Sequence, residues 1–125
     1  MKTLKLKKEL SELYTLNKFI HEELGKENLQ LDLIIEEIFV NIVNYSKTEF
    51  IIVKVEYNPE SRVVIEFVDN GVEFNPLLKD DPEMVDNIKD AEIGGRGIYL
   101  VKNLADDIEY YRENDKNHFK VIKNV

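Results

Sequence analysis

The sequence contains no cysteine and only two histidines, His21 and His118. Without cysteine the protein has no disulfide, no thiolate metal site and no cysteine nucleophile, which fits a reducing compartment. The histidines form no cluster of the kind that binds zinc, so a zinc site has no support. No apolar stretch approaches the ~20 residues that cross a bilayer, and the N-terminus has no signal-peptide pattern. We therefore expect a cytoplasmic protein that makes no contact with a membrane.

Positive charge is scarce as well, with 17 lysines and arginines against 25 acidic residues and a net charge of −8. An acidic surface repels phosphate backbones, so we expect no direct binding of nucleic acid. The other bulk values are ordinary for a soluble protein: 125 residues, of which 43% are hydrophobic and 34% charged. A chain of this length suits a single domain over residues 1–125, whose core needs neither a disulfide nor a metal.

The spacing of apolar residues predicts a series of strands and helices. In chain order they are a strand at 4–7, helices at 8–24 and about 31–45, strands at 50–57 and 62–68, a helix at 97–104, and strands at 107–112 and 118–123. Because strands and helices are largely segregated, the pattern predicts an α+β fold. We expect a two-layer sandwich with a mixed, mostly antiparallel sheet that helices cover on one face.

Residues 72–93 show no periodicity and carry two of the three prolines and seven acidic residues. A long irregular stretch inside a compact domain is commonly functional, and often forms a lid. Met84, Val85 and Ile88 could form one short helical turn within it.

Asp69 ends a predicted buried strand and is followed by Asn70 and Gly71. A carboxylate there can accept a hydrogen bond from an exocyclic amine such as adenine N6, and Gly71 would let the backbone pass close to a flat base. The alternative is a turn, because Asn-Gly is a common hairpin dipeptide. A hairpin turn should be followed by a strand, whereas the irregular residues 72–93 follow here.

Gly94, Gly95 and Gly97 precede the helix predicted at 97–104. Free N–H groups at a helix start, together with small residues, allow close approach of a polyphosphate. The spacing differs from that of a P-loop and from that of a dinucleotide fingerprint. For an isolated glycine cluster, a flexible hinge is the alternative.

Glu37, Asn41 and Asn44 recur at i, i+4 and i+7 of the second predicted helix and therefore share one stripe. A carboxylate and an amide oxygen can serve as a general base and a Mg²⁺ ligand. A solvated polar stripe is the alternative. Asparagine is a mediocre helix former, however, so two asparagines in mid-helix make this alternative less favourable.

Taken in their order along the chain, these motifs resemble those of the GHKL ATPase superfamily, whose ATP-binding domains have the Bergerat fold. The matching motifs are Glu37-x-x-x-Asn41 for the N box, Asp69-x-Gly71 for the G1 box, and Gly95-x-Gly97 with Ile98 for the G2 box. The resemblance spans roughly residues 4–123.

Within this superfamily the chain is most similar to the small anti-sigma factor serine/threonine kinases of bacterial partner switching. The similarity rests on Phe74-Asn75-Pro76 after the G1 box, on residues 93–102 and on Asp107–Tyr110. It implies an ATP- and Mg²⁺-dependent protein serine/threonine kinase. The implied partners are a STAS-type anti-anti-sigma protein as substrate, a sigma factor that the kinase sequesters, and a second copy in a homodimer.

The resemblance also implies roles for individual residues. Glu37 would polarise the attacking hydroxyl or water, Asn41 would chelate Mg²⁺, and residues 72–93 would form the ATP lid. Arg96 stands where many relatives have leucine, and it could reach a phosphate or face solvent. The nucleotide-binding set implied in this way is Asn41, Asn44, Asp69, Gly71, Phe74, Gly94, Gly95, Arg96, Gly97 and Ile98.

Two other functions fit parts of this pattern. A non-catalytic ATP-binding module that binds a partner in a nucleotide-dependent way would carry the same pocket residues. A histidine kinase would need a phosphoacceptor, for which His21 is the candidate, but the chain is too short for a separate phosphoacceptor domain. We therefore expect His21 to be a surface residue of the first helix and His118 a strand residue.

Overall fold

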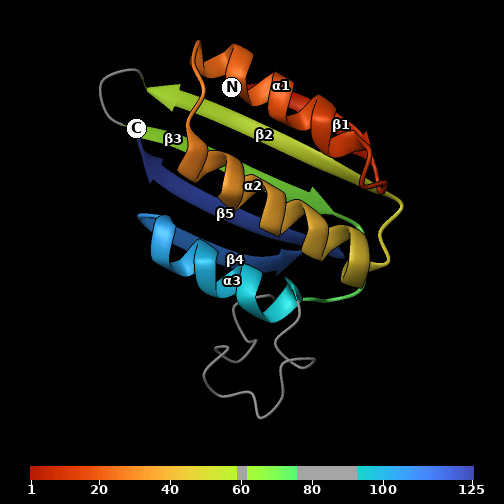
Figure 1. The fold of residues 1–125 in the computed structure, drawn as a ribbon. Coiled ribbons are helices and arrows are strands. Elements are labelled where there is room, and N and C mark those ends of the chain that lie inside the picture. Colours follow the sequence, from red (N-terminus) through yellow and green to blue (C-terminus); the bar gives the residue numbers. More distant parts are fainter. Residues whose placement is uncertain (59–61, 76–92) are drawn as a thin grey trace.

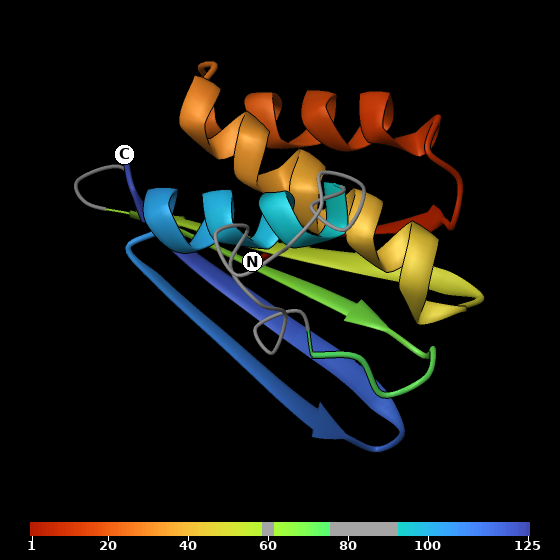
Figure 2. The same ribbon diagram turned by 60° about the horizontal axis from the view of Figure 1, so that its bottom comes forward.

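The computed structural model describes residues 1–58, 62–75 and 93–125. Its elements are β1 (Lys2–Lys7), α1 (Glu12–Leu24), α2 (Leu29–Asn41), η1 (Ile42–Ser46), β2 (Phe50–Asn58), β3 (Arg62–Asp69), α3 (Ile93–Leu104), β4 (Asp107–Glu113) and β5 (Lys116–Asn124). The strands form one sheet, and the helices lie together on one face of it (Figures 1 and 2). The predicted α+β two-layer sandwich is therefore confirmed.

The five strands follow the order β1-β2-β3-β5-β4, and every described pair is antiparallel. The described sheet thus lacks the parallel pair that a mixed sheet would contain. Strand β3 is central and ends at Asp69, which lies opposite Ile51 of β2 and Asn117 of β5. The end of β3 is therefore flanked by a neighbouring strand on each side.

Strand β3 alternates between a buried and a less buried side. Val63, Ile65 and Phe67 are at most 1% exposed and belong to the core that the helices cover. Side chains alternate across a strand with period two, so Asp69 points to this same side. The pattern that builds the core therefore also directs a carboxylate into the sandwich.

The helix boundaries follow local signals that apolar spacing does not record. Helix α1 starts at Glu12 instead of Lys8, because the preceding residues form a turn in which the Glu12 N–H donates to the Glu9 carbonyl at 3.0 Å. Its predicted end at residue 24 is confirmed: the next residue, Gly25, has φ +72° and donates its N–H to the His21 carbonyl. Helix α2 starts at Leu29 behind Asn28, whose side chain caps it.

The last turn of the second helix is not α-helical. The predicted end near Tyr45-Ser46 is confirmed, but residues Ile42–Ser46 form the π-helical turn η1. Lys47, with φ +58°, then reverses the chain. π turns are rare in proteins overall, but many of those that occur lie at functional sites.

Helix α3 begins at Ile93, so the three glycines lie inside its first turns and not before it. Glycine disfavours helix interiors, which is why the pattern predicted a start at Gly97. Most of the predicted lid, 76–92, with its predicted helical turn, lies outside the described residues, and so do residues 59–61 between two of the predicted strands. Among the described helices, none has the length and apolar content that crossing a membrane requires.

The turn between β4 and β5 is shorter than the gap between the strands predicted at 107–112 and 118–123. Asn114 and Asp115 have φ values of +54° and +59°, as expected for the two central residues of a short type I′ hairpin turn. Strand β5 therefore starts at Lys116. The start predicted at residue 118 for the last strand is therefore wrong, because Asn117 is already a strand residue.

Candidate functional site

The carboxylate of Asp69 is buried, with 2% of the residue exposed, and is held by three donors. Its Oδ1 accepts hydrogen bonds from Ser46 Oγ at 2.5 Å, the Gly71 N–H at 2.9 Å and Asn117 Nδ2 at 3.0 Å. These donors come from η1, the segment after β3, and β5. Because all three bonds end on Oδ1, Oδ2 has no such donor among the described residues and is the oxygen that a ligand could use.

Gly71 is required by a close approach inside the protein. A Cβ at this position would collide with both the carbonyl oxygen and the Oγ of Ser46. The next residue, Val72, donates its N–H to that same Ser46 carbonyl at 2.7 Å. From the sequence, Gly71 was expected to let the backbone pass close to a flat base. In the structure, the neighbour that requires a glycine here is Ser46 of η1.

The alternative of a simple Asp-Asn-Gly hairpin turn does not hold in the described residues. Asn70 Oδ1 accepts the Glu49 N–H at 2.9 Å and lies 2.7 Å from Thr48 Oγ1. The Asn70 N–H donates back to Thr48 Oγ1 at 3.0 Å. These bonds fix the end of β3 to the start of β2, and residues 71–75 continue without forming a strand.

Asn117 is a buried centre of hydrogen bonds that the sequence did not reveal. Besides its bond to Asp69, its Nδ2 donates to the Val72 carbonyl at 2.8 Å. Its Oδ1 accepts from the Phe74 N–H, Tyr110 Oη and Arg112 Nη1, at 3.2, 2.5 and 3.1 Å. The false loop boundary placed Asn117 in a connection, so nothing in the pattern directed attention to it.

Two further contacts hold the segment that leaves β3. Arg112 Nη1 also donates to the Gly71 carbonyl at 2.9 Å. The Phe74 ring lies against that of Tyr45, with centroids 5.8 Å apart. Phe74, predicted as a nucleotide-binding residue, is therefore positioned by η1 and by Asn117.

On α2, Glu37 and Asn41 lie one turn apart. Asn41 is completely buried, and its Nδ2 donates to the Glu37 carbonyl at 2.7 Å, which fixes the orientation of the amide. Asn41 Oδ1 and Glu37 Oε2 are both buried without a partner among the described residues. An unpartnered buried acceptor costs about 1–3 kcal/mol, so two on one helix face need an explanation.

Carboxylate and amide oxygens are the atoms that a hard cation such as Mg²⁺ prefers, and Mg²⁺ takes few protein ligands beside phosphates and waters. The pair therefore fits a Mg²⁺–nucleotide ligand. Burial raises the pKa of Glu37 above its ordinary value of 4.5, and the charge of Glu36 raises it further. A raised pKa suits a carboxylate that accepts a proton near neutral pH.

The stripe predicted for Glu37, Asn41 and Asn44 ends at its second member. Asn44 lies in the π turn η1, where α-helical spacing no longer applies, and it is exposed. It does not share the burial of Glu37 and Asn41.

Helices α2 and α3 run side by side in opposite directions, so the start of α3 lies near the C-terminal half of α2 and near the end of β3 (Figures 1 and 2). Gly94, Gly95, Arg96, Gly97 and Ile98 all lie in the first turns of α3. Their side chains are outside the described part of the chain. The first N–H groups of a helix have no intrahelical partner, so this helix start can accept an anion.

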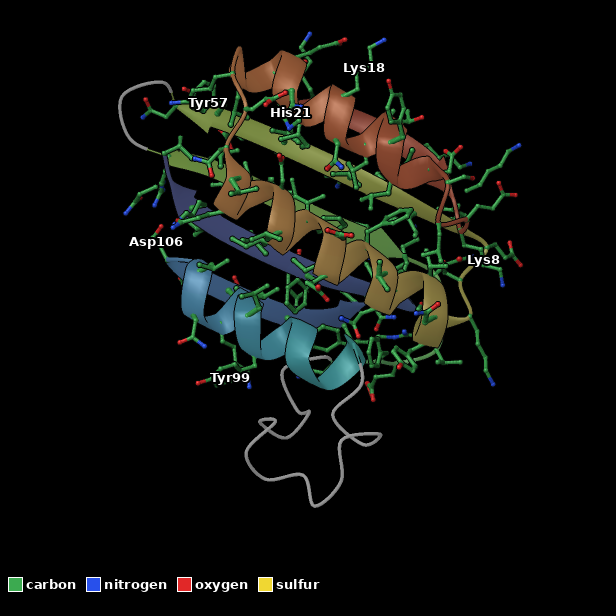
Figure 3. The ribbon with its side chains drawn as sticks, viewed as in Figure 1. Lys8, Lys18, His21, Tyr57, Tyr99 and Asp106 are labelled. Carbon is green, nitrogen blue, oxygen red and sulfur yellow. The ribbon has the colours of Figure 1, made fainter. Side chains whose placement is uncertain are left out.

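His21 is a half-buried residue of α1 that contacts an acidic residue of α2. It lies on the side of α1 toward α2 (Figure 3), and its Nε2 is 2.8 Å from Asp32 Oδ1. The side chain is 27% exposed. His118 is a β5 residue, as predicted, and its Nδ1 lies 2.9 Å from Glu66 Oε1.

The protein-family model for the histidine kinase-like ATPase domain matches residues 8–123 of the chain. This match covers every predicted site residue, from Glu37 to Ile98, and also Asn117. No curated protein matches the chain at a significant level.

Proposed function

Because the chain belongs to the family of histidine kinase-like ATPase domains, we propose that it binds ATP with Mg²⁺ and acts as a protein serine/threonine kinase. The proposed substrate is a serine of a STAS-type anti-anti-sigma protein, and a sigma factor is the proposed regulatory partner. The observation that carries the proposal is a pair of buried acceptors on α2, Glu37 Oε2 and Asn41 Oδ1, which have no hydrogen-bond partner among the described residues.

In this proposal Asp69 and α3 bind opposite ends of the nucleotide. Asp69 Oδ2 accepts a hydrogen bond from the adenine amine, while the three donors on Oδ1 hold the carboxylate in place. The first N–H groups of α3 face the phosphates, whose negative charge a helix N-terminus favours. Asn41 Oδ1 is the proposed Mg²⁺ ligand. When bound, Mg²⁺ would supply positive charge that offsets the charge of the phosphates.

Glu37 is the proposed general base. The acceptor hydroxyl attacks the γ-phosphorus, the bond from that phosphorus to the β–γ bridging oxygen breaks, and ADP leaves with the bonding electrons. The hydroxyl proton passes to the Glu37 carboxylate. Positioning and electrostatic stabilisation supply most of the rate in phosphoryl transfer, so a single partly buried carboxylate is sufficient as the base.

The partner surface that we propose lies on and beside α1. Leu10 and Tyr14 are 52% and 80% exposed there. Next to them is an open groove of about 570 Å³, whose lining includes Lys18 and His21 (Figure 3). An exposed aromatic ring beside charged side chains is typical of residues that anchor protein interfaces. A homodimer is part of the proposal too, and sedimentation would test it.

The test is transfer of label from [γ-³²P]ATP to a partner protein. Proteins captured from the native organism with and without ATP and Mg²⁺ supply the candidates, and the label should appear on a serine of a STAS-domain protein. Glu37→Gln should bind ATP but lose transfer, while Glu36→Gln, exposed on the same helix, should retain both. Binding of ATP without any phosphoprotein would instead support a non-catalytic, nucleotide-dependent regulator.

A further inference from the structure

Asn117 lies between the proposed base-binding residue and the segment that follows β3, and it bonds to both. On one side lies Asp69, directly opposite it in the antiparallel pair β3–β5. On the other side lies the backbone of residues 71–74, which leaves β3 and leads toward the segment predicted as a lid. The Asn117 side chain is buried and bonds to both.

The orientation of the Asn117 amide is fixed by its partners. Nδ2 faces two acceptors, Asp69 Oδ1 and the Val72 carbonyl. Oδ1 faces three donors, from Phe74, Tyr110 and Arg112. A flipped amide would place its N–H groups against donors and its oxygen against acceptors, so only one orientation satisfies the network.

Two neighbours reinforce this orientation. Burial raises the pKa of the Tyr110 phenol above its ordinary 10.0, so the phenol keeps its proton and donates it to Asn117. Arg112 bonds to Asn117 Oδ1 and to the Gly71 carbonyl through the same Nη1. Through Arg112, strand β4 is therefore bonded directly to the segment at 71–74 as well as to Asn117.

We propose that Asn117 is a positioning residue that couples recognition of the nucleotide base at Asp69 to the conformation of residues 71–74. The proposal rests on the proposed function, because it takes Asp69 as the group that binds an exocyclic amine. The amide is one rigid plane with partners at both ends. A movement of Asp69 toward a ligand therefore leaves a buried donor unpaired unless residues 71–74 move with it.

The chain offers a direct reporter of this coupling, because it contains no tryptophan. Tyr45→Trp places a single indole against Phe74, the last residue of the coupled segment. Calorimetry would first establish that the unmodified protein and Tyr45→Trp bind ATP with Mg²⁺ equally well. Emission is then followed during titration with ATP and Mg²⁺, in Tyr45→Trp alone and combined with Asn117→Ala.

We expect ATP to shift the emission of Tyr45→Trp. Adding Asn117→Ala should weaken ATP binding about 10-fold or more and remove the shift even at saturation. The preference for ATP over GTP should fall as well, because Asp69 is no longer fixed. Phe119→Leu is the matched control: it alters a buried residue two positions along the same strand with no polar contact to Asp69, and it should keep shift and preference despite a lower Tm.

A full emission shift in the saturated Asn117→Ala protein would overturn the coupling. So would binding of ATP with no shift in Tyr45→Trp itself, which leaves the proposed function intact. Failure of the unmodified protein to bind ATP would overturn the proposed function and this inference with it. If Asn117→Ala does not fold, Arg112→Met decides: it keeps the apolar stem and removes the link to Gly71, and an unreduced shift contradicts the proposal.

Discussion

Replacement of Glu37 by glutamine should stabilise the fold and stop the proposed reaction. The pKa of Glu37 is raised because burial disfavours the charged carboxylate, with a further contribution from Glu36. A carboxyl whose pKa is higher in the folded state than in the unfolded chain binds its proton more tightly on folding. The folded state is therefore penalised at pH values above that pKa, and the penalty disappears below the ordinary value of 4.5.

The size of the effect depends on the charge, because glutamine keeps a polar atom at the buried Oε2 position and removes only the charge. Glu37 is only partly buried and solvent screens part of its charge, so about 1 kcal/mol is expected for Glu37→Gln near pH 8. This corresponds to a rise of about 4 °C in Tm for a domain of this size. The gain should shrink as the pH falls toward the ordinary pKa of 4.5, because the carboxyl then takes up its proton in both states.

Urea unfolding followed by circular dichroism at both pH values measures the gain, and the phosphotransfer assay measures activity. Loss of a general base lowers the rate by about 10²–10⁴-fold. Glu36→Gln is the control, since it removes the same charge from an exposed position of α2 and should change stability by less than about 0.5 kcal/mol. The reasoning is refuted if Glu37→Gln is no more stable than wild type near pH 8, or if its gain does not depend on pH.

Three other substitutions test the remaining parts of the site. Asp69→Asn keeps an oxygen for the three donors on Oδ1 but presents N–H groups to the base amine, so ATP affinity should fall about 100-fold with Tm little changed; unchanged affinity in calorimetry contradicts the base assignment. Asn41→Ala should weaken ATP binding about 10-fold when Mg²⁺ is present and little without it; an equal loss in both titrations excludes a ligand role. Gly71→Ala drives a methyl group into the Ser46 backbone and should cost about 2–3 kcal/mol in urea unfolding; a wild-type midpoint would show that the segment relaxes easily.

The fold was predictable because its signals are periodic. Alternation along β3 and the apolar face of α2 indicated the sandwich, and both depend on side chains that point in regular directions. Boundaries were less predictable where a local conformation overrides the period. The turn before Glu12, the π turn after Asn41 and the glycines inside α3 are all cases of this kind.

The site was predictable only in part. Glu37, Asn41 and Asp69 were identified because each combines a polar side chain with a position in a buried element. Asn117 and Ser46 were missed for different reasons. Asn117 depended on a strand start set by two positive φ angles, and Ser46 depended on a turn that brings it next to a residue 23 positions away. Neither relation appears as a local pattern.

The π turn η1 has a consequence for insertions and deletions. A π turn closes its hydrogen bonds over five residues instead of four, so Ile42–Ser46 accommodates one residue more than an α-helical turn does. Removing a single residue here, with the helix otherwise kept, would rotate the downstream residues by about 100° and turn Ser46 away from Asp69. Substitutions at exposed Asn44 would leave the backbone path intact. A deletion scan through 42–46 would therefore expose a requirement for chain length that an alanine scan does not detect.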